Sequence, residues 1–535
     1  MNSGNFSSKN RSVIIEKMNA SIFDILIIGG GITGAGIALD ASARGLKVAL
    51  IDMQDFAAGT SSRSTKLIHG GLRYLKQFEF KLVAEVGKER EIIHRNAPHL
   101  TKPEPMLLPI VKGGSLGKFS TRIAMWIYEW LAGVKKEEWH KILSKEETIK
   151  AEPLLEKNNL LGGVLFYEYR TDDARLTIEV IKEAVNRGAT ALNYMKAISF
   201  NYEKEKICGA IVQDQITKKE YSIKAKYVVN ASGPWVDELD DLETKKETHK
   251  LQLTKGVHIV VDQKKLPVKQ SLYFDTHDKR MIFIIPREGK TYIGTTDTFY
   301  NGDLVDPKVT QEDTVYLLKC CNAYFPNNQI LETDIESSWA GLRPLIKKPG
   351  KGPSEISRKD EMFESASGMI IIAGGKLTGY RKMAERVVDL IGKKTLSTEN
   401  KTLSECSTSN ISIAGGKLNS NQSFSTLKKT LIEQGNVLGL SNNEAETLVY
   451  RYGPNTLKIF KFIEQLKNEE SDLPVLIRAQ IQYCIEYEMC LTPEDFFIRR
   501  TGMSYFAIGE KRKWEEELVK YMKKIIDMNG AGEVI

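Results

Sequence analysis

Near the N-terminus, apolar residues alternate between the spacing of buried strands and the spacing of a helix. Residues 24–28 (DILII) are a short, β-branched run of the kind that fills a buried parallel strand. A glycine-rich turn, a helix pattern beginning near Ile32 and a second apolar run at residues 47–51 follow. A later run at residues 369–373 (MIIIA) also leads into glycines and a helix pattern. These alternations predict a parallel sheet built from β–α–β units.

Strand patterns dominate the middle of the chain. Residues 101–111 are proline-rich and extended, residues 192–223 predict a strand pair, and residues 251–300 hold β-rich runs typical of antiparallel strands. Helices are predicted at residues 81–97, 174–188 and 309–325. The β-rich runs therefore predict a second, substrate-binding domain beside the parallel sheet.

The two ends of the chain differ from its centre. Residues 1–20 are polar and mixed in charge, which predicts a disordered tail with Met18 as an alternative start. Residues 396–420 are rich in Ser, Thr and Asn and predict a linker. Residues 421–535 combine many charges with helical spacing, so we expect a separate helical domain there.

The most hydrophobic helix pattern covers residues 115–132 and is flanked by Lys and Arg. Its aromatic residues and basic flanks suit an interfacial helix on anionic lipid. A core helix with internally packed aromatics explains the pattern equally well. Both interpretations stay open from the sequence.

Composition limits the class of protein. The chain of 535 residues is long enough for two or three domains. Its net charge of +7 fits an acidic substrate or an anionic membrane surface, while the lack of a dense basic stripe argues against nucleic acid. Without an apolar run of membrane-spanning length or an apolar leader, neither a transmembrane helix nor a signal peptide is predicted. Six cysteines without CxxC spacing and scattered histidines favour a reducing compartment and argue against a metal site.

The first glycine turn has the spacing of a dinucleotide-binding fingerprint. Gly29 permits the tight turn, Gly31 lets backbone approach a pyrophosphate, and Gly34 lets the following helix pack close to the strand. The helix N-terminus then faces the phosphates. Asp52 ends the second strand and is placed to accept hydrogen bonds from a ribose. The alternative is a glycine-rich turn in an unrelated α/β protein.

The later glycine turn favours FAD over NAD. Gly374, Gly375 and Lys376 join a buried strand to a helix, whose positive N-terminus suits the pyrimidine edge of a flavin. The sequence has no second GxGxxG unit for a nicotinamide. Residues 231–235 (ASGPW) end another buried strand and are expected at the same edge of the sheet. A simple third β–α unit is the alternative interpretation of the late turn.

Basic residues in loops and at strand ends indicate an anionic substrate. They are Arg73, Arg343, Arg358 and Lys376, and glycines beside three of them allow close approach. Arg presents a planar fork to phosphate or carboxylate oxygens, whereas Lys acts as a point charge. Each residue taken alone is equally explained by a surface ion pair.

His69 and His258 are the candidate proton acceptors. Oxidation of an alcohol by a flavin requires loss of the hydroxyl proton, and a histidine near its neutral pKa suits that task. Nearby cations would lower the pKa of the imidazole and keep it neutral. A structural role for either histidine is the alternative.

Taken together, several segments resemble the FAD-dependent, membrane-associated (aerobic) glycerol-3-phosphate dehydrogenases. They span about residues 22 to 505 and read IIGGGITGAGIALDAS, TSSRSTKLIHGGLRYL, KGVHIVV, IPREGKTYIGTTD, AGLRPL, GGKLTGYRKMAE and EDFFIRRTG. The resemblance implies oxidation of sn-glycerol 3-phosphate to dihydroxyacetone phosphate by hydride transfer to FAD. It also implies that electrons pass on to membrane quinone.

The resemblance further implies an α/β fold in which a Rossmann-type FAD domain is interleaved with a β-rich substrate domain, as in glycine oxidase and D-amino-acid oxidase. A C-terminal all-α domain completes the chain. The expected boundaries are 21–100, 166–240 and 345–395 for the FAD-binding domain, 101–165 and 241–344 for the substrate domain, and 396–535 for the helical domain.

Motif matching also implies roles for individual residues. The implied substrate-binding residues are Arg73, Tyr74, His258, Arg343, Arg358 and Lys376. The implied catalytic residues are His69, which we prefer as the base, His258, Arg343 and Lys376. The implied FAD-binding residues are Gly29, Gly31, Thr33, Gly34, Asp52, Thr60, Ser61, Ser62, Ser232, Gly233, Gly375, Lys376, Leu377 and Thr378. No metal is expected.

The chain departs from many relatives at two positions. Asp52 stands where Glu is common, and it keeps the carboxylate that binds ribose. Thr378-Gly379-Tyr380 stands where Thr-Thr-Tyr is common, which removes a hydroxyl near the flavin.

The implied partners are glycerol 3-phosphate, membrane quinone, an anionic lipid surface and a second copy in a homodimer. The implied location is cytoplasmic, peripheral to the inner face of the cell membrane. The nearest rival function is a glycerol-3-phosphate oxidase that uses dioxygen and releases hydrogen peroxide, but the insertion usual in those relatives is missing between Arg358 and Lys376. A flavin-stabilised interaction protein without turnover is a third hypothesis, against which the cations and both histidines argue.

Overall fold

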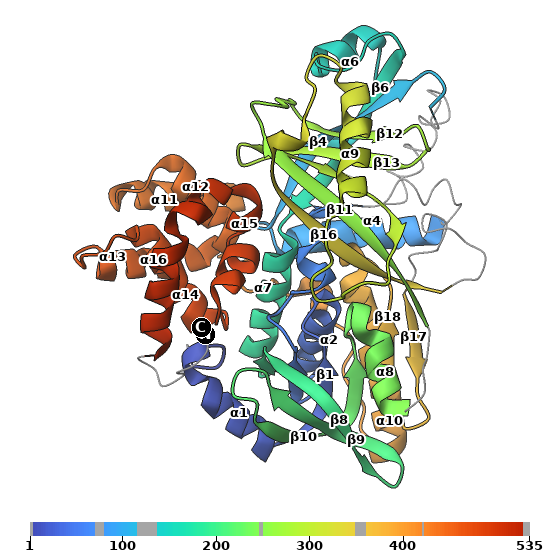
Figure 1. Cartoon of the computed structure of the whole chain (residues 1–535). Helices are drawn as coiled ribbons and strands as arrows, with labels where there is room; N and C mark the ends of the chain where they lie inside the picture. The colour runs from blue at the N-terminus through green and yellow to red at the C-terminus, as the bar shows by residue number, and fades with distance from the viewer. Residues whose placement is uncertain are drawn as a thin grey trace.

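Two β-sheets with their covering helices, followed by a helical C-terminal region, make up the chain (Figure 1). The computed structural model describes residues 4–69, 80–114, 136–244, 250–347, 360–419 and 422–527. The helix expected at residues 115–132 lies outside the described residues, as do Arg73, Tyr74 and Arg358.

The first sheet holds the predicted nucleotide-binding unit. Its central strand β1 (Ile22–Ile28) runs parallel to β2 (Val48–Ile51) and to β10 (Glu220–Asn230), and β10 runs parallel to β18 (Ile370–Ala373). Parallel alignment brings the carboxyl ends of these strands to one edge, where open α/β sheets bind ligands. The remaining strands of this sheet are β7 (Thr190–Leu192), β8 (Met195–Glu203), β9 (Lys206–Asp214) and β17 (Glu361–Glu364).

Three helices pack in series beside this sheet. Helix α2 (Ile32–Ala43) contacts α7 (Asp173–Asn186) on one side and α10 (Tyr380–Glu399) on the other. Nearly all of α2 is buried, including Asp40, which is paired with Arg44 at 2.6 Å. The predicted alternation of buried strands and helices is therefore confirmed in this region.

The second sheet has ten strands and is largely antiparallel. Strand β11 (Leu251–Asp262) lies between β16 (Ile335–Ile346) and β14 (Lys290–Gly294), and β4 (Thr101–Val111) pairs with β6 (Leu160–Thr171). The domain boundary expected at residue 166 was wrong, because it falls inside β6. Its other strands are β3 (Leu67–Ile68), β5 (Lys141–Leu143), β12 (Ser271–Asp275), β13 (Met281–Arg287) and β15 (Thr298–Phe299). Helices α4 (Phe80–Asn96), α6 (Lys145–Ala151) and α9 (Gln311–Tyr324) contact this sheet, whereas α8 (Val236–Thr244) contacts β8 and β10 of the first sheet.

The C-terminal region is helical, as predicted, and has its own apolar core. Figure 1 shows these helices on one side of α7. They are α11 (Phe424–Val437), α12 (Asn442–Tyr452), α13 (Thr456–Leu466), α14 (Val475–Tyr487), the π-helical turn η9 (Asp495–Arg500), α15 (Met503–Phe506) and α16 (Ile508–Asp527). Residues 403–416, inside the predicted linker, are held against the first sheet by buried Ile411 and Ile413.

The prediction of a disordered N-terminal tail was wrong. Residues 4–20 contain a short 3-10 turn and helix α1 (Arg11–Ala20). Ser8 donates a hydrogen bond to the Cys490 carbonyl at 2.6 Å, while Arg11 is paired with buried Asp214 at 2.7 Å. This segment is ordered because apolar side chains such as Phe6 and Met18 join the core around the first sheet and its polar groups meet buried partners, which composition alone does not reveal.

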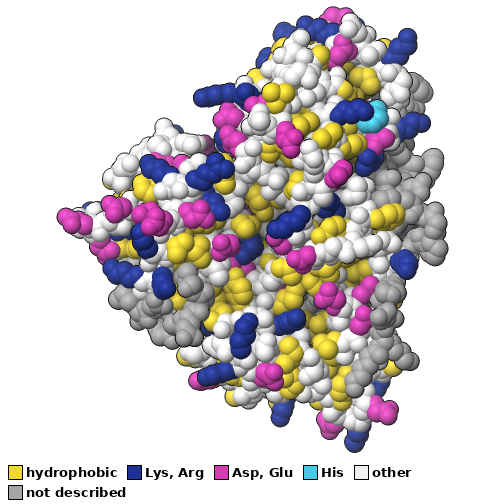
Figure 2. Space-filling view, in the orientation of Figure 1, with side chains coloured by type: hydrophobic (Ala, Val, Ile, Leu, Met, Phe, Trp, Pro, Cys, Tyr) yellow, Lys and Arg dark blue, Asp and Glu magenta, His cyan; other side chains and the backbone are white. Residues whose placement is uncertain are grey.

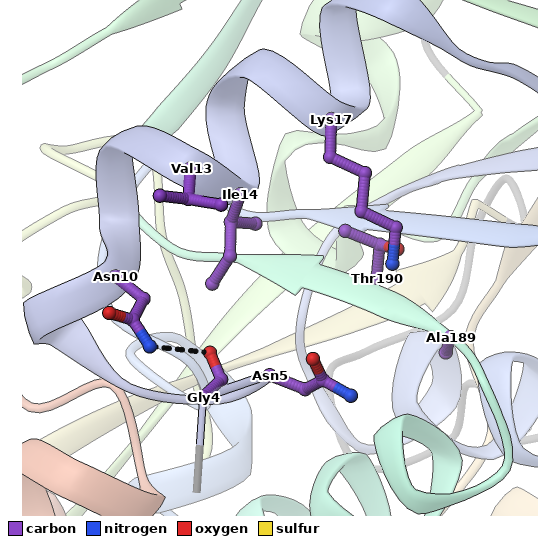
Figure 3. A pocket seen from close by; sticks show the side chains of 8 residues that line it. All are labelled: Gly4, Asn5, Asn10, Val13, Ile14, Lys17, Ala189 and Thr190. Atoms are coloured by element: carbon purple, nitrogen blue, oxygen red, sulfur yellow. Dashed lines mark hydrogen bonds between the residues drawn. The ribbon is translucent and has the colours of Figure 1, made fainter. Parts of the chain in front are cut away.

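A cavity of about 250 Å³ separates this N-terminal segment from the start of β7 (Figure 3). Its lining residues are Gly4, Asn5, Asn10, Val13, Ile14, Lys17, Ala189 and Thr190. None of the predicted site residues lines this cavity. Most of those that the structure describes lie instead at or near the ends of strands.

Charge is spread over the visible surface. On the face shown in Figure 2, basic and acidic side chains are interspersed among the described residues. Among the residues that the structure describes, no helix combines the length and apolar character needed to cross a bilayer.

Candidate cofactor and substrate site

The first glycine turn is shaped for close backbone approach. Gly29 has φ +116°, which favours glycine, and a Cβ there would overlap the Ala231 carbonyl. A Cβ on Gly34 would overlap the Gly29 carbonyl, so α2 could no longer lie against the turn. At Gly31, the same atom would lie 3.1 Å from the Ser61 hydroxyl. The turn therefore has the cradle that a pyrophosphate requires.

Asp52 closes this turn from the end of β2. One carboxylate oxygen accepts from the Gly30 N–H at 2.7 Å and the other from the Gln54 N–H at 2.9 Å. Burial raises the pKa of Asp52 to about 7, despite these two hydrogen bonds. Each oxygen keeps a further lone pair for a ribose hydroxyl, as the sequence prediction requires.

The segment after this turn supplies hydroxyl groups. Ser61 accepts a hydrogen bond from the Ile32 N–H at 2.9 Å, at the first residue of α2, and Thr33 lies in the same helical turn. Thr60 donates to the Leu342 carbonyl at 2.7 Å, directly before Arg343. Ser62 is buried, and its hydroxyl has no hydrogen-bond partner among the described residues. An unpartnered buried hydroxyl beside the turn fits a polar ligand.

Two other strand ends meet the same edge. Asn230 pairs in register with Ile28 on one side and with Ile371 on the other, so the turn after β10 lies between the first glycine turn and the turn after β18. The predicted Ser232 and Gly233 follow β10, and the predicted Gly375, Lys376, Leu377 and Thr378 follow β18. Convergence of three strand–turn units from distant parts of the chain fits a cofactor the size of FAD.

Arg343 occupies the second sheet, beside this edge. Its guanidinium donates to Asp297 at 3.1 Å and to the Thr295 hydroxyl at 3.0 Å, and a Cβ at Gly256 would overlap it. The side chain of Arg343 remains 19% exposed. Both terminal nitrogens also donate to the Thr296 carbonyl at 3.3 Å, so these partners fix the position of a partly exposed positive charge at the sheet edge.

His258 is more deeply buried than its predicted role suggests. It is 2% exposed and stacks on Trp339 with ring centroids 4.7 Å apart. Its Nε2 atom lies 3.0 Å from the Thr65 hydroxyl, and its Nδ1 atom has no partner among the described residues. Burial, together with Arg343 and Lys66, holds the pKa of His258 well below its usual value. The imidazole is therefore neutral near pH 7, as expected, but sealed from solvent.

His69 and Lys376 are both half-buried. His69 follows β3, its ring centroid lies 6.1 Å from that of Phe283, and its carbonyl accepts from the Thr378 hydroxyl at 3.3 Å. That hydrogen bond joins the segment after β3 to the turn after β18. The predicted base therefore stands next to the predicted flavin-binding turn.

Sequence reasoning missed the groups that support these residues. Lys66, which lies in the segment TSSRSTKLIHGGLRYL, is buried and paired with Asp173 at 2.6 Å. Its ammonium also lies 5.6 Å from the centroid of the Trp339 ring that stacks on His258. The lysine itself is visible in the sequence, but its burial and its pairing with Asp173, over a hundred residues away, are not.

The architecture and this edge were then compared with known proteins. Residues 24–380 match the family described as FAD dependent oxidoreductase, and residues 406–531 match the C-terminal domain of alpha-glycerophosphate oxidase. An aerobic glycerol-3-phosphate dehydrogenase of Bacillus subtilis (strain 168) is 53% identical over 97% of this chain and 94% of the relative. The chain belongs to the FAD-dependent glycerol-3-phosphate dehydrogenase family. Membership confirms the prediction of FAD as the cofactor and of an enzyme as the class of protein.

Solved structures agree with this family membership. The glycerol-3-phosphate dehydrogenase from Bacillus halodurans, complexed with FAD, is 45% identical with a TM-score of 0.83, covering 98% of this chain and 94% of its own. Glycine oxidase from Geobacillus kaustophilus is 19% identical with a TM-score of 0.53, covering 70% of this chain and 95% of its own. The second likeness concerns the fold alone, and it confirms the predicted glycine-oxidase-like body.

Proposed function

We propose that this member of the dehydrogenase family oxidises sn-glycerol 3-phosphate to dihydroxyacetone phosphate and passes the electrons to membrane quinone. The observation that carries the proposal is the hydrogen bond that joins the segment after the glycine turn to the backbone of the residue before Arg343. Thr60 donates to the carbonyl directly before Arg343, so a phosphate-binding group stands beside the nucleotide site. The relative from B. subtilis, aligned almost end to end, supports the same substrate.

In this proposal the cations hold the phosphate of the substrate. Arg343 contributes N–H groups at the sheet edge, and Arg73, Arg358 and Lys376 contribute further positive charge. Tyr74 and His258 complete the proposed substrate pocket. Bound FAD supplies the hydride acceptor for oxidation of the secondary alcohol.

His69 accepts the proton of the substrate hydroxyl in the same proposal. Its carbonyl is bonded to Thr378, which belongs to the turn after β18. His258, by contrast, has no exposed nitrogen to offer, because both its ring and its Nδ1 atom are buried. We therefore propose His69 as the base and His258 as a neutral wall of the pocket.

Reduction of the flavin without an electron acceptor tests the substrate assignment. Glycerol 3-phosphate added anaerobically to the holoenzyme should bleach the flavin absorbance, whereas glycerol at the same concentration should not. Failure to bleach would favour a flavin-stabilised interaction protein over an enzyme.

The electron acceptor distinguishes the dehydrogenase from its rival. With glycerol 3-phosphate in air and no quinone, we expect slow turnover and little hydrogen peroxide, and a soluble quinone analogue should accelerate turnover. Near-stoichiometric peroxide without quinone would instead identify a glycerol-3-phosphate oxidase.

The quinone acceptor also requires access to a bilayer. We propose peripheral association with the inner face of the cell membrane through an anionic lipid surface, for which the mild positive charge is suited. Sedimentation with anionic and with zwitterionic vesicles measures this: preference for anionic vesicles that disappears in high salt is the expected result.

A homodimer is proposed as the assembly, and light scattering of the holoenzyme gives its mass.

A further inference from the structure

Asp55, three residues after the ribose-binding Asp52, is completely buried and accepts hydrogen bonds from three side chains. Arg499 donates to it at 2.5 Å, Arg500 donates at 2.7 and 3.0 Å, and Asn193 donates at 2.9 Å. Burial alone would raise the pKa of Asp55, but the two guanidinium groups outweigh it and hold that pKa below its usual range. The carboxylate is thus a permanent anion inside the protein.

Both arginines belong to the C-terminal helical region, in the π-helical turn η9. Arg499 is held in place by Asp495 at 2.6 Å, and Arg500 donates to the Glu488 carbonyl at 2.8 Å. These partners hold the two guanidinium groups in place independently of Asp55. A rigid, paired fork of this kind can orient a loop as well as neutralise its charge.

The loop that contains Asp55 encloses the dinucleotide turn. A Cβ on Gly30 would overlap the Phe56 ring, and the Ala57 N–H donates to the Gly30 carbonyl at 3.0 Å. Asp52 accepts from the Gly30 N–H on the other side. Gly30 is therefore contacted by Asp52, three residues before Asp55, and by Phe56 and Ala57, directly after it, so a shift of Asp55 would displace the wall of the cofactor site.

We propose that Arg499 and Arg500 are positioning residues for FAD. Through Asp55 they hold the loop of residues 52–59 against the dinucleotide turn, so the C-terminal helical region completes a cofactor site that lies in the other end of the chain. The proposal rests on FAD as the cofactor and is independent of the substrate.

Binding of FAD to the apoprotein tests this proposal. The variants are Arg500→Met, which removes the fork, and Asp55→Asn, which keeps the shape of the acceptor and removes its charge. Each should weaken FAD binding by about ten-fold or more, measured as the Kd from quenching of flavin fluorescence. The double variant should show less loss than the sum of both changes, because the two residues act through one contact.

Asp313→Asn is the matched control. Asp313, in the first turn of α9, is a buried carboxylate paired at 2.6 Å with Lys255 of β11, away from the loop of residues 52–59 in the chain. We expect this variant to lower the apoprotein Tm as the others do, while its Kd for FAD stays at the native value. Unchanged FAD affinity in folded Asp55→Asn, or an equal loss in Asp313→Asn, would overturn the proposal.

Arg499→Lys is a conservative variant that tests the same contact with less risk of misfolding than Arg500→Met. It keeps the charge near Asp55 but loses the planar fork, so its FAD affinity should lie between native and Arg500→Met, with a native circular-dichroism spectrum. Native affinity in this variant together with native affinity in Asp55→Asn would contradict a positioning role.

Discussion

The two walls of the site are built in contrasting ways. The proposed cofactor wall consists of the glycine turn, the loop of residues 52–62 and the turn after β10, and the ion pair behind that loop, Asp55 with Arg500, is completely buried. The proposed substrate wall consists of Arg343, on the second sheet, and its partners. There the guanidinium of Arg343 is 19% exposed and is paired with Asp297 at 3.1 Å.

This difference reflects what each wall must do. A retained cofactor is served by backbone groups fixed in position, and buried ion pairs supply that rigidity at the cost of desolvation. A substrate that enters and leaves at every turnover needs charges that can change partners, which favours shallow, partly solvated pairs. Substitutions on the two walls should therefore have different effects. Those on the cofactor wall should weaken FAD binding, and those on the substrate wall should weaken substrate binding.

On the cofactor wall, the largest loss of FAD binding is expected from Gly34→Ala. The added methyl overlaps the Gly29 carbonyl, so either the turn or α2 must move. We expect FAD binding weaker by about 10–100-fold, in line with overpacking in a rigid site. The ratio of flavin to protein absorbance after gel filtration reports it. Gly509→Ala, where a Cβ meets no atom within 4 Å, is the control, and a fully flavinated Gly34→Ala protein would contradict the rigid-wall interpretation.

The next prediction concerns turnover and separates the roles of His69 and His258. His69→Gln should lower kcat by about 10²–10⁴-fold, the usual contribution of a general base. His258→Gln should lower it less, and no titration of His258 should appear in the kcat/KM profile above its depressed pKa. Stopped-flow reduction of the flavin across pH measures both. A greater loss in His258→Gln than in His69→Gln would reverse the assignment.

Arg343→Ala should act on substrate capture. Loss of a charge-assisted hydrogen bond of about 1.5–3 kcal/mol lowers kcat/KM for glycerol 3-phosphate by about 10–100-fold, mostly through KM. Activity with glycerol, measured at a much higher concentration, should change little, because glycerol lacks the phosphate. Arg187→Ala, which removes an exposed pair with Glu183 of α7, provides the comparison. Equal loss for both substrates would show that Arg343 does not bind phosphate.

The smallest effect concerns the pH dependence of cofactor binding. The pKa of Asp52 is raised to about 7, so its carboxylate is protonated as pH falls below that value and accepts ribose hydroxyls less well. FAD affinity should fall by up to about ten-fold per pH unit below the pKa, and Asp52→Asn should bind FAD weakly but without this dependence. Asp55 remains ionised throughout the same range. A native Kd that is constant across neutral pH would contradict the prediction.

The raised pKa of Asp52 also determines how its contribution to protein stability changes with pH. A folded-state pKa above that of the unfolded chain means that the native apoprotein binds the proton more tightly. The contribution of Asp52 is thus fully present below about pH 4 and is lost as pH rises to about 7. Apoprotein of the Asp52→Asn variant should lack this part of the pH profile in thermal unfolding.

The sequence predicted those parts of the fold that depend on local pattern. The glycine turn, the order of strands and helices, and the helical C-terminal region are confirmed, because each is encoded by spacing within a short stretch. Local pattern wrongly predicted disorder for residues 4–20, since Arg11 is held by Asp214, a partner two hundred residues away. The boundary at residue 166 failed for a related reason: β6 continues through it to pair with β4.

By itself, then, the sequence determined the chemistry available: glycines for a dinucleotide, cations for an anion and histidines for a proton. The tertiary structure alone decided which of these groups are sealed and which are accessible. It buried His258 against Trp339, left Arg343 partly exposed, and brought Arg499 and Arg500 to Asp55 from the far end of the chain. Burial and long-range pairing depend on how whole elements pack, and that packing sets the pKa and the reach of every charged group.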